Sequence, residues 1–113
     1  MSARLSFAAL AFAVASCAYV EATTTQYVGV PRFTPTKPAE VQVLPAEPKQ
    51  RHDRLGEVLL DISVDPAPPV ADIEERLREE GAKMGANAVY VIRDAIRPGE
   101  GRKLIGIAIR FRQ

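Results

Sequence analysis

Residues 70–92, VADIEERLREEGAKMGANAVYVI, decide the fold, because they have the pattern of one helix that leads directly into a strand. Acidic residues are concentrated between positions 72 and 80 and are expected on the solvent face of the helix. Gly85 stands where a left-handed C-terminal cap is expected. The apolar residues recur at helical spacing and form one inner stripe: Val70, Ile73, Leu77, Gly81 and Met84.

Strand patterns lie on both sides of this helix. Residues 58–64 alternate between apolar and other side chains, and the proline-rich residues 65–69 end that run. Residues 87–97 are predicted to form a second strand. Residues 98–101, Pro-Gly-Glu-Gly, are typical of a hairpin turn, and residues 103–112 are predicted to form a third strand.

This order predicts an α+β fold, with a small β-α-β-β domain over residues 55–113. One helix would cover a three-stranded mixed sheet, in which the strands joined by the helix run parallel and the hairpin adds an antiparallel strand. A domain of this size buries a limited core, so a further strand or self-association would help it. Residues 41–44 alternate as an edge strand does, which leaves a four-stranded sheet open.

Residues 17–54 have a different composition. Five of the nine prolines fall there, with several threonines among them. Proline removes backbone donors and favours extended geometry, so we expect an irregular or polyproline-like tether that could span up to ~110 Å. Two short apolar pieces within it, residues 27–30 and 41–44, are candidates for local order.

The N-terminal residues 1–16 have the pattern of a signal peptide. Arg4 precedes an apolar run from Leu5 to Ala15, which is too short for a relaxed membrane span. Val14-Ala15-Ser16-Cys17 is similar to the bacterial lipoprotein signal, in which the cysteine is lipidated and becomes the first mature residue. We therefore expect Cys17 to carry the lipid and to attach the protein to the membrane.

Two alternatives to lipidation stay open. An ordinary cleavable signal with an incidental cysteine fits the small residues on both sides of Ser16, and an uncleaved N-terminal helix is a third interpretation. In lipoprotein signals an Asp after the cysteine favours the inner membrane, whereas this chain has Ala18. We therefore expect a lipid-anchored envelope protein on the outer membrane, facing the periplasm.

Charge and chemistry argue against several classes of function. Arg4 is the only charged residue before Cys17, so the mature chain has 14 basic and 14 acidic side chains, and bulk charge does not favour nucleic acid binding. His52 is the only histidine and cannot form an ordinary zinc site or triad by itself. Gly99 and Gly101 lack the context of a phosphate-binding loop. We expect no catalytic residue, metal or cofactor.

Residues 77–89, LREEGAKMGANAV, together with Leu55-Gly56-Glu57-Val58, resemble the recurring core of small bacterial envelope domains. The layout is similar to that of the outer-membrane lipoprotein sensors of the Rcs stress phosphorelay, which have a lipidated cysteine, a proline-rich tether and a β-α-β-β domain. The domain of those sensors is disulfide-bonded, whereas Cys17 is the only cysteine here. The resemblance therefore implies a shared fold rather than a shared signalling role.

The sheet face away from the helix is the expected interaction surface. We expect Val58, Leu60 and Ile62 under the helix, together with the isoleucines of residues 105–109 and Phe111. The function predicted is that of a non-enzymatic interaction or sensor module that binds an envelope protein or itself. The alternative is a small-ligand or metal-binding module, either monomeric or oligomeric. The expected interaction residues are Leu59, Leu104, Gly106 and Ala108, ringed by Arg110 and Arg112.

Overall fold

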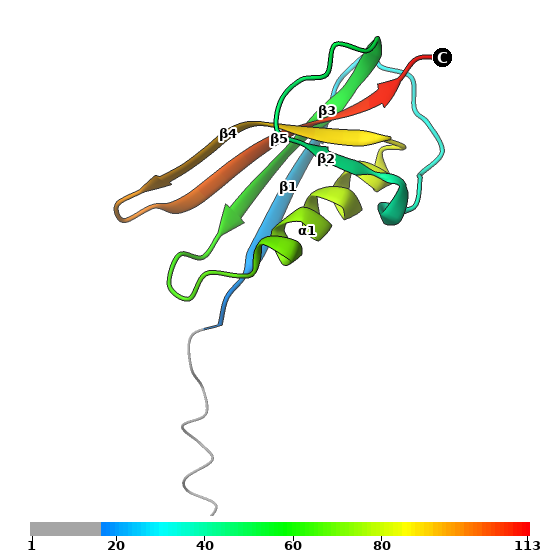
Figure 1. The fold of residues 1–113 in the computed structure, drawn as a ribbon. Coiled ribbons are helices and arrows are strands. Elements are labelled where there is room, and N and C mark those ends of the chain that lie inside the picture. The colour runs from blue at the N-terminus through cyan, green and yellow to red at the C-terminus, as the bar shows by residue number, and fades with distance from the viewer. Residues whose placement is uncertain (1–16) are drawn as a thin grey trace, which may run out of the picture.

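The computed structural model describes residues 17–113, so the predicted signal peptide lies outside the described residues. The fold is α+β, as predicted, with one α-helix against one face of a mixed sheet (Figure 1). The elements in chain order are β1 (Val20–Gln26), the 3-10 helix η2 (Pro38–Glu40), β2 (Gln42–Leu44), β3 (His52–Ile62), α1 (Val70–Lys83), β4 (Ala88–Arg97) and β5 (Gly101–Phe111).

The sheet has five strands in the order β1-β3-β5-β4-β2. β5 is the central strand and runs antiparallel to both β3 and β4, so those two strands run parallel to each other, as expected for strands joined by a helix. β1 pairs antiparallel with β3 at one edge, and β2 pairs parallel with β4 at the other. The sheet therefore has two strands more than the three-stranded prediction.

Both extra strands come from residues 17–54, so the expectation of an irregular tether over this range was wrong. β1 alternates between half-buried and exposed residues along its whole length, and its central residues are threonines, which suit a strand because they branch at Cβ. Between β1 and β2 the chain is tied to the end of α1. The Thr36 amide donates to the Ala82 carbonyl at 2.9 Å, and the Thr36 hydroxyl donates to the Ala86 carbonyl at 2.8 Å.

Of the two apolar pieces in this range, only the second is a strand. Residues 42–44 form β2, which confirms the predicted edge strand. Residues 27–30 follow β1 as a turn, in which Gly29 has a φ of 84°.

The main core lies between α1 and the sheet. Val58, Leu60 and Ile62 point into it, as predicted. Leu104 and Ala108 also lie there and are 4% and 0% exposed, so their predicted place on the opposite face was wrong. The reason is the register, because Leu60 pairs with Leu104, and directly paired residues share a face.

Gly106 is also under the helix. A Cβ at this position would lie 2.7 Å from Cγ1 of Val89 and 3.4 Å from Cδ2 of Leu77. The small residues of β5 therefore let α1 pack closely on the sheet and leave space for the side chain of Val89 on β4. The larger isoleucine set, which was expected under the helix, lies on the opposite face, because packing requires small residues here.

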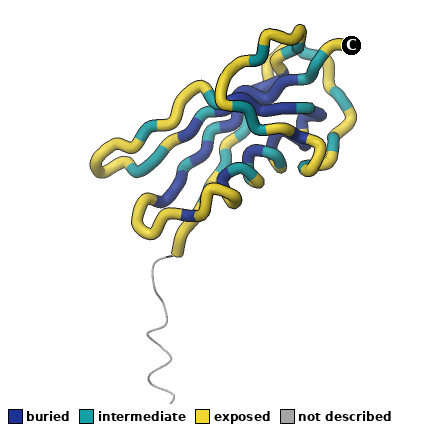
Figure 2. The backbone as a smooth tube through the Cα atoms, viewed as in Figure 1, coloured by how far each residue is buried: buried dark blue, intermediate teal, exposed yellow. Residues whose placement is uncertain are grey.

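The odd-numbered residues of β5 face away from α1. Ile107 and Ile109 form a second, smaller buried cluster with Ala88 and Tyr90, and Phe111 packs against it. Residues 45–51 connect β2 to β3 at this end of the sheet. Figure 2 shows that burial is concentrated at the helix-covered part of the sheet, whereas the β4–β5 hairpin is largely exposed.

Glu80 departs from the expected solvated acidic face of the helix, because it is only 6% exposed. Its carboxylate accepts hydrogen bonds from the Thr24 hydroxyl at 2.7 Å and the Lys83 ammonium at 2.8 Å. Burial opposes ionisation, but these hydrogen bonds outweigh it and hold the pKa of Glu80 below its usual value. Glu80 therefore links α1 to β1.

Gly85 forms the predicted left-handed cap, with a φ of 82°. The amide of Gly85 donates to the Ala82 carbonyl, and the amide of Ala86 donates to the Gly81 carbonyl, both at 3.0 Å. These two bonds have the Schellman pattern that ends a helix and redirects the chain. In this chain the cap directs the backbone from α1 into β4.

Replacing Gly81 with alanine is expected to destabilise the domain. A Cβ on Gly81 would lie 2.7 Å from Cγ2 of Val89, a fully buried side chain that is too short to move aside. Overpacking costs about 1–3 kcal/mol, against a gain of about 1 kcal/mol in helix propensity. Thermal unfolding followed by circular dichroism should therefore give a Tm about 5 °C lower for Gly81→Ala.

A second substitution checks the cause. Val89→Ala should cost less stability in the Gly81→Ala background than in the wild type, because it removes the clashing methyl group. A Tm for Gly81→Ala equal to or above that of the wild type would contradict the close helix-to-sheet packing.

Candidate functional site

The candidate site is the part of the sheet that faces away from α1, which we call the open sheet face. Alternation along each strand gives its members, because the intervening residues lie under the helix. Register places Leu59 between Thr23 on β1 and Ile105 on β5, and Ile105 pairs in turn with Arg93 on β4. Leu59 and Ile105 are both half-buried and form the apolar centre of the face.

Opposite charges flank this apolar centre. Glu21, Glu57 and Asp61 lie on the β1–β3 side, and Arg93, Arg97 and Lys103 lie on the β4–β5 side. Lys103 forms an ion pair with Asp61, and this hydrogen bond raises the pKa of Lys103. Arg93 and Arg97 take part in no salt bridge within residues 17–113, so their charges are available to another molecule.

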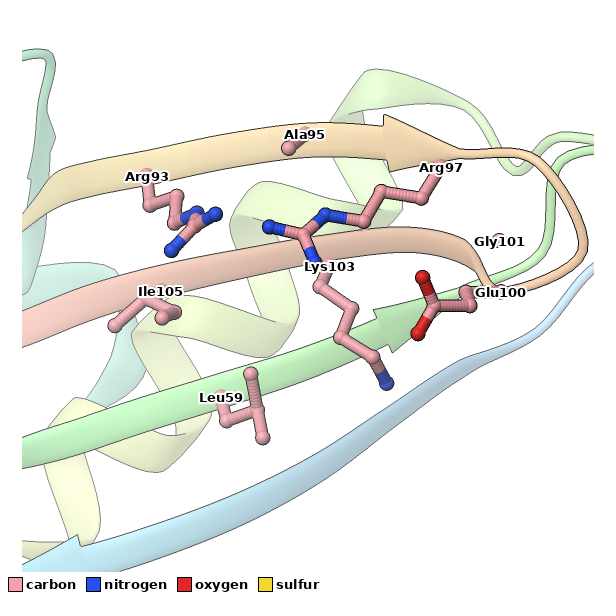
Figure 3. A pocket seen from close by; sticks show the side chains of 8 residues that line it. All are labelled: Leu59, Arg93, Ala95, Arg97, Glu100, Gly101, Lys103 and Ile105. Carbon is pink, nitrogen blue, oxygen red and sulfur yellow. The ribbon is translucent and has the colours of Figure 1, made fainter.

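A hollow of about 150 Å³ lies on the open sheet face beside the hairpin turn. Figure 3 shows Leu59, Ile105, Arg93 and Lys103 together on the near side of the sheet, with the helix behind it. Glu100 lies at the turn end of the same hollow. This arrangement offers a small apolar floor with cationic side chains around it.

The β4–β5 hairpin, which carries these residues, is stabilised by an ion pair on its opposite face. Arg102 donates from Nε and Nη2 to the two carboxylate oxygens of Asp94, at 2.8 Å and 2.7 Å. These bonds lower the pKa of Asp94 and raise that of Arg102, although burial opposes both changes. The fork geometry ties β4 to β5 beyond the region that α1 covers.

Of the six residues expected at the interaction surface, only Leu59 lies on the open sheet face. Leu104, Gly106 and Ala108 are in the main core instead. Arg110 donates to the Gly85 carbonyl at 2.7 Å, and its guanidinium lies 4.7 Å from the centre of the Phe33 ring.

Arg112, the last of the six, is paired with Asp53 at the start of β3. Neither it nor Arg110 rims the apolar centre. The interaction surface expected from the sequence did not include Arg93 and Arg97, which a β-bulge between Val91 and Arg93 brings onto this face. Ile105 was expected under the helix, but it pairs with Leu59 and lies on this face instead. The spacing of Arg93, Ala95 and Arg97 at every second position was the available signal.

His52 belongs to a packed structural cluster at the start of β3. Its Nε2 atom lies 2.9 Å from a carboxylate oxygen of Glu47, which also accepts a hydrogen bond from Arg54 at 2.8 Å. The imidazole contacts the rings of Tyr90 and Phe111 edge-on, with ring centres 6.3 Å and 6.4 Å apart. Hydrogen bonds from Arg54 and His52 lower the pKa of Glu47. These contacts hold residues 45–51 on the sheet.

Cys17, the predicted lipidation site, is exposed and lies close to the sheet. Only Ala18 and Tyr19 separate it from the first residue of β1. The Tyr19 amide donates to the Ser63 hydroxyl at 2.9 Å, and the Ser63 amide donates to the Tyr19 carbonyl at 3.1 Å. Tyr19, two residues after Cys17, is therefore hydrogen-bonded to the chain just after β3.

Within residues 17–113, no group of three or more His, Cys, Asp or Glu side chains is placed to hold a metal ion. The single α-helix in that part of the chain is not of the length and apolar character needed to span a bilayer. Comparisons with protein-family models, with curated proteins and with solved structures give no match to this chain.

Proposed function

We propose that this chain is a non-enzymatic lipoprotein of the bacterial cell envelope, attached through Cys17, whose open sheet face binds another protein. The resemblance of residues 14–17 to the lipoprotein signal supports the attachment. The observation that carries the binding function is the half-buried apolar centre at Leu59 and Ile105, which lies between two rows of opposite charge. An apolar centre with a charged rim is typical of protein interfaces.

The order of charges favours a second copy of the chain as the partner. Across a twofold axis, the acidic β1–β3 side of one copy would meet the basic β4–β5 side of the other, and the two apolar centres would pack together. A different envelope protein with the same charge arrangement would bind to the same face. In either case, whether the partner is a second copy or another protein, it would contact Ile105.

A second candidate function is the binding of a small anion. The hollow beside Arg93, Arg97 and Lys103 favours it, because Arg93 and Arg97 take part in no salt bridge within residues 17–113 and lie beside a small apolar floor. Calorimetric titration of the protein with small envelope anions would support this function if heat were released by the wild type and not by Arg97→Glu.

Photo-crosslinking tests the proposed protein-binding function. A photoreactive phenylalanine derivative at position 105 should form one dominant adduct when illuminated in intact cells, because the side chain of Ile105 lies at the centre of the open sheet face. The mass of the adduct distinguishes a dimer from a complex with another protein. The control is position 28, which is fully exposed after β1 and outside the face. Equal labelling at both positions, or none at position 105, would contradict the proposal.

A further inference from the structure

Cys17 lies too close to the sheet for the domain to stand clear of a membrane. Three Cα steps separate Cys17 from Val20, and an extended chain covers at most about 3.6 Å per residue, or roughly 10 Å in total. The headgroup layer on one side of a bilayer is about 5–8 Å thick. If Cys17 carries acyl chains, the end of the sheet where β1 begins must lie at the membrane surface.

The register identifies the residues at this end of the sheet. Val20 pairs with Ile62, Ile62 with Arg102, and Arg102 with Ile96, so these four residues form one row across the strands. Neighbouring strands are about 4.8 Å apart, which places Ile96 roughly 14 Å from Val20. Figure 1 shows the loop between β3 and α1 and the β4–β5 hairpin projecting from this end of the sheet.

Exposed apolar side chains are concentrated at this end. Of the seven large apolar residues that stand exposed in residues 17–113, Ile96 lies on the row, Tyr19 and Val64 lie one and two residues beyond it, and Val70 begins α1 after the loop. Their exposed fractions are 51% for Tyr19, 44% for Val64, 67% for Val70 and 63% for Ile96. Tyrosine beside aliphatic residues suits the boundary between headgroups and acyl chains.

We propose that this end of the domain, through Tyr19, Val64, Val70 and Ile96, inserts into the headgroup layer of the membrane that holds Cys17. The inference rests on the proposed lipid attachment and adds a defined orientation to it. This end carries charges of both signs, because Asp65 lies in the loop after β3, Asp72 in the first turn of α1, and Glu100 between Arg97 and Arg102 in the hairpin. The contact therefore depends on apolar insertion rather than on anionic lipid.

The orientation also accounts for the position of the open sheet face. With the β1 start at the membrane, the strands rise away from the bilayer, so Leu59 and Ile105 face sideways above the surface. Two copies in the same membrane could then meet through their open faces. Attachment thus restricts the encounter of two copies to the plane of the membrane.

Tryptophan fluorescence tests the orientation, because the chain contains no tryptophan of its own. The full lipidated protein would carry Val70→Trp or Ile96→Trp and be reconstituted into phosphatidylcholine vesicles with or without brominated acyl chains. The control variant is Val28→Trp, at the opposite end of β1 and 101% exposed. Brominated lipid should quench Val70→Trp and Ile96→Trp at least twofold more strongly than Val28→Trp, and added anionic lipid should change this little.

The outcomes separate this inference from the lipid attachment on which it rests. Mass spectrometry of each preparation reports whether Cys17 carries the lipid. Lipidated protein that is retained on the vesicles but shows no quenching at positions 70 and 96, or equal quenching at position 28, would overturn the orientation and leave the attachment intact. Unmodified Cys17 would overturn both proposals.

Discussion

Cys17→Ser is expected to release the protein from the membrane fraction into the soluble fraction. The thioether to diacylglycerol forms only on a cysteine sulfur, so a hydroxyl at this position leaves the chain without acyl groups. Stable attachment takes more than one acyl chain, and the apolar side chains at the sheet end are too few to replace them. Fractionation of cells after high-salt and carbonate washes, followed by immunodetection, measures the change.

Ala18→Ser is the matched control for this loss, because it changes a neighbouring small residue and keeps the cysteine. That variant should stay in the membrane fraction. Mass spectrometry of the wild type should show a diacylglyceryl group on an N-terminal Cys17. An unmodified mature N-terminus at Ser16 or Tyr19 would contradict lipidation and favour the ordinary cleavable signal.

Leu104→Asp is expected to abolish folding. Leu104 is 4% exposed within the main core, opposite Leu60, and the substitution both empties its space and places a carboxylate there. The lost packing alone costs about 2–5 kcal/mol, and an unpaired buried carboxylate adds several more. A small domain is stable by about 5–10 kcal/mol, so little or no folded protein should remain. Circular dichroism should show no cooperative thermal transition.

The next residue provides the control. Ile105→Glu changes a half-buried side chain on the open sheet face, beside Arg93 and Lys103, and should keep the wild-type spectrum and a cooperative transition. The opposite result, with Leu104→Asp folded and Ile105→Glu unfolded, would mean that the two faces of β5 are reversed.

Local patterns were sufficient to predict the helix, its cap and the hairpin in the second half of the chain. The helix over residues 70–83, the cap at Gly85 and the hairpin around Gly99 each depend on periodicity or on a glycine with positive φ, which neighbouring residues encode. The five-stranded sheet depends instead on pairing between distant segments. Residues of β1 pair with residues of β3 that lie 30–42 positions further along the chain, and the threonines of β1 suit a tether as well as a strand.

The faces of the sheet could not be assigned from apolar content. Both sets of alternating residues in β5 contain apolar side chains, and the larger set lies away from the helix. Only the pairing of Leu60 with Leu104, together with the small volume of Gly106, shows which set is under α1. The predicted place on the sheet face away from α1 was therefore correct for Leu59 and wrong for Leu104, Gly106 and Ala108.

Co-purification from solubilised envelopes tests most directly the claim that the open sheet face binds a protein. The lipidated wild type, Ile105→Glu and the control Val28→Glu would each be crosslinked in cells and purified by the same tag. We expect the wild type and Val28→Glu to retain the same partner, either a second copy or another protein. The amount of partner recovered with Ile105→Glu should be at least tenfold lower. Undiminished partner recovery with folded Ile105→Glu would contradict the account.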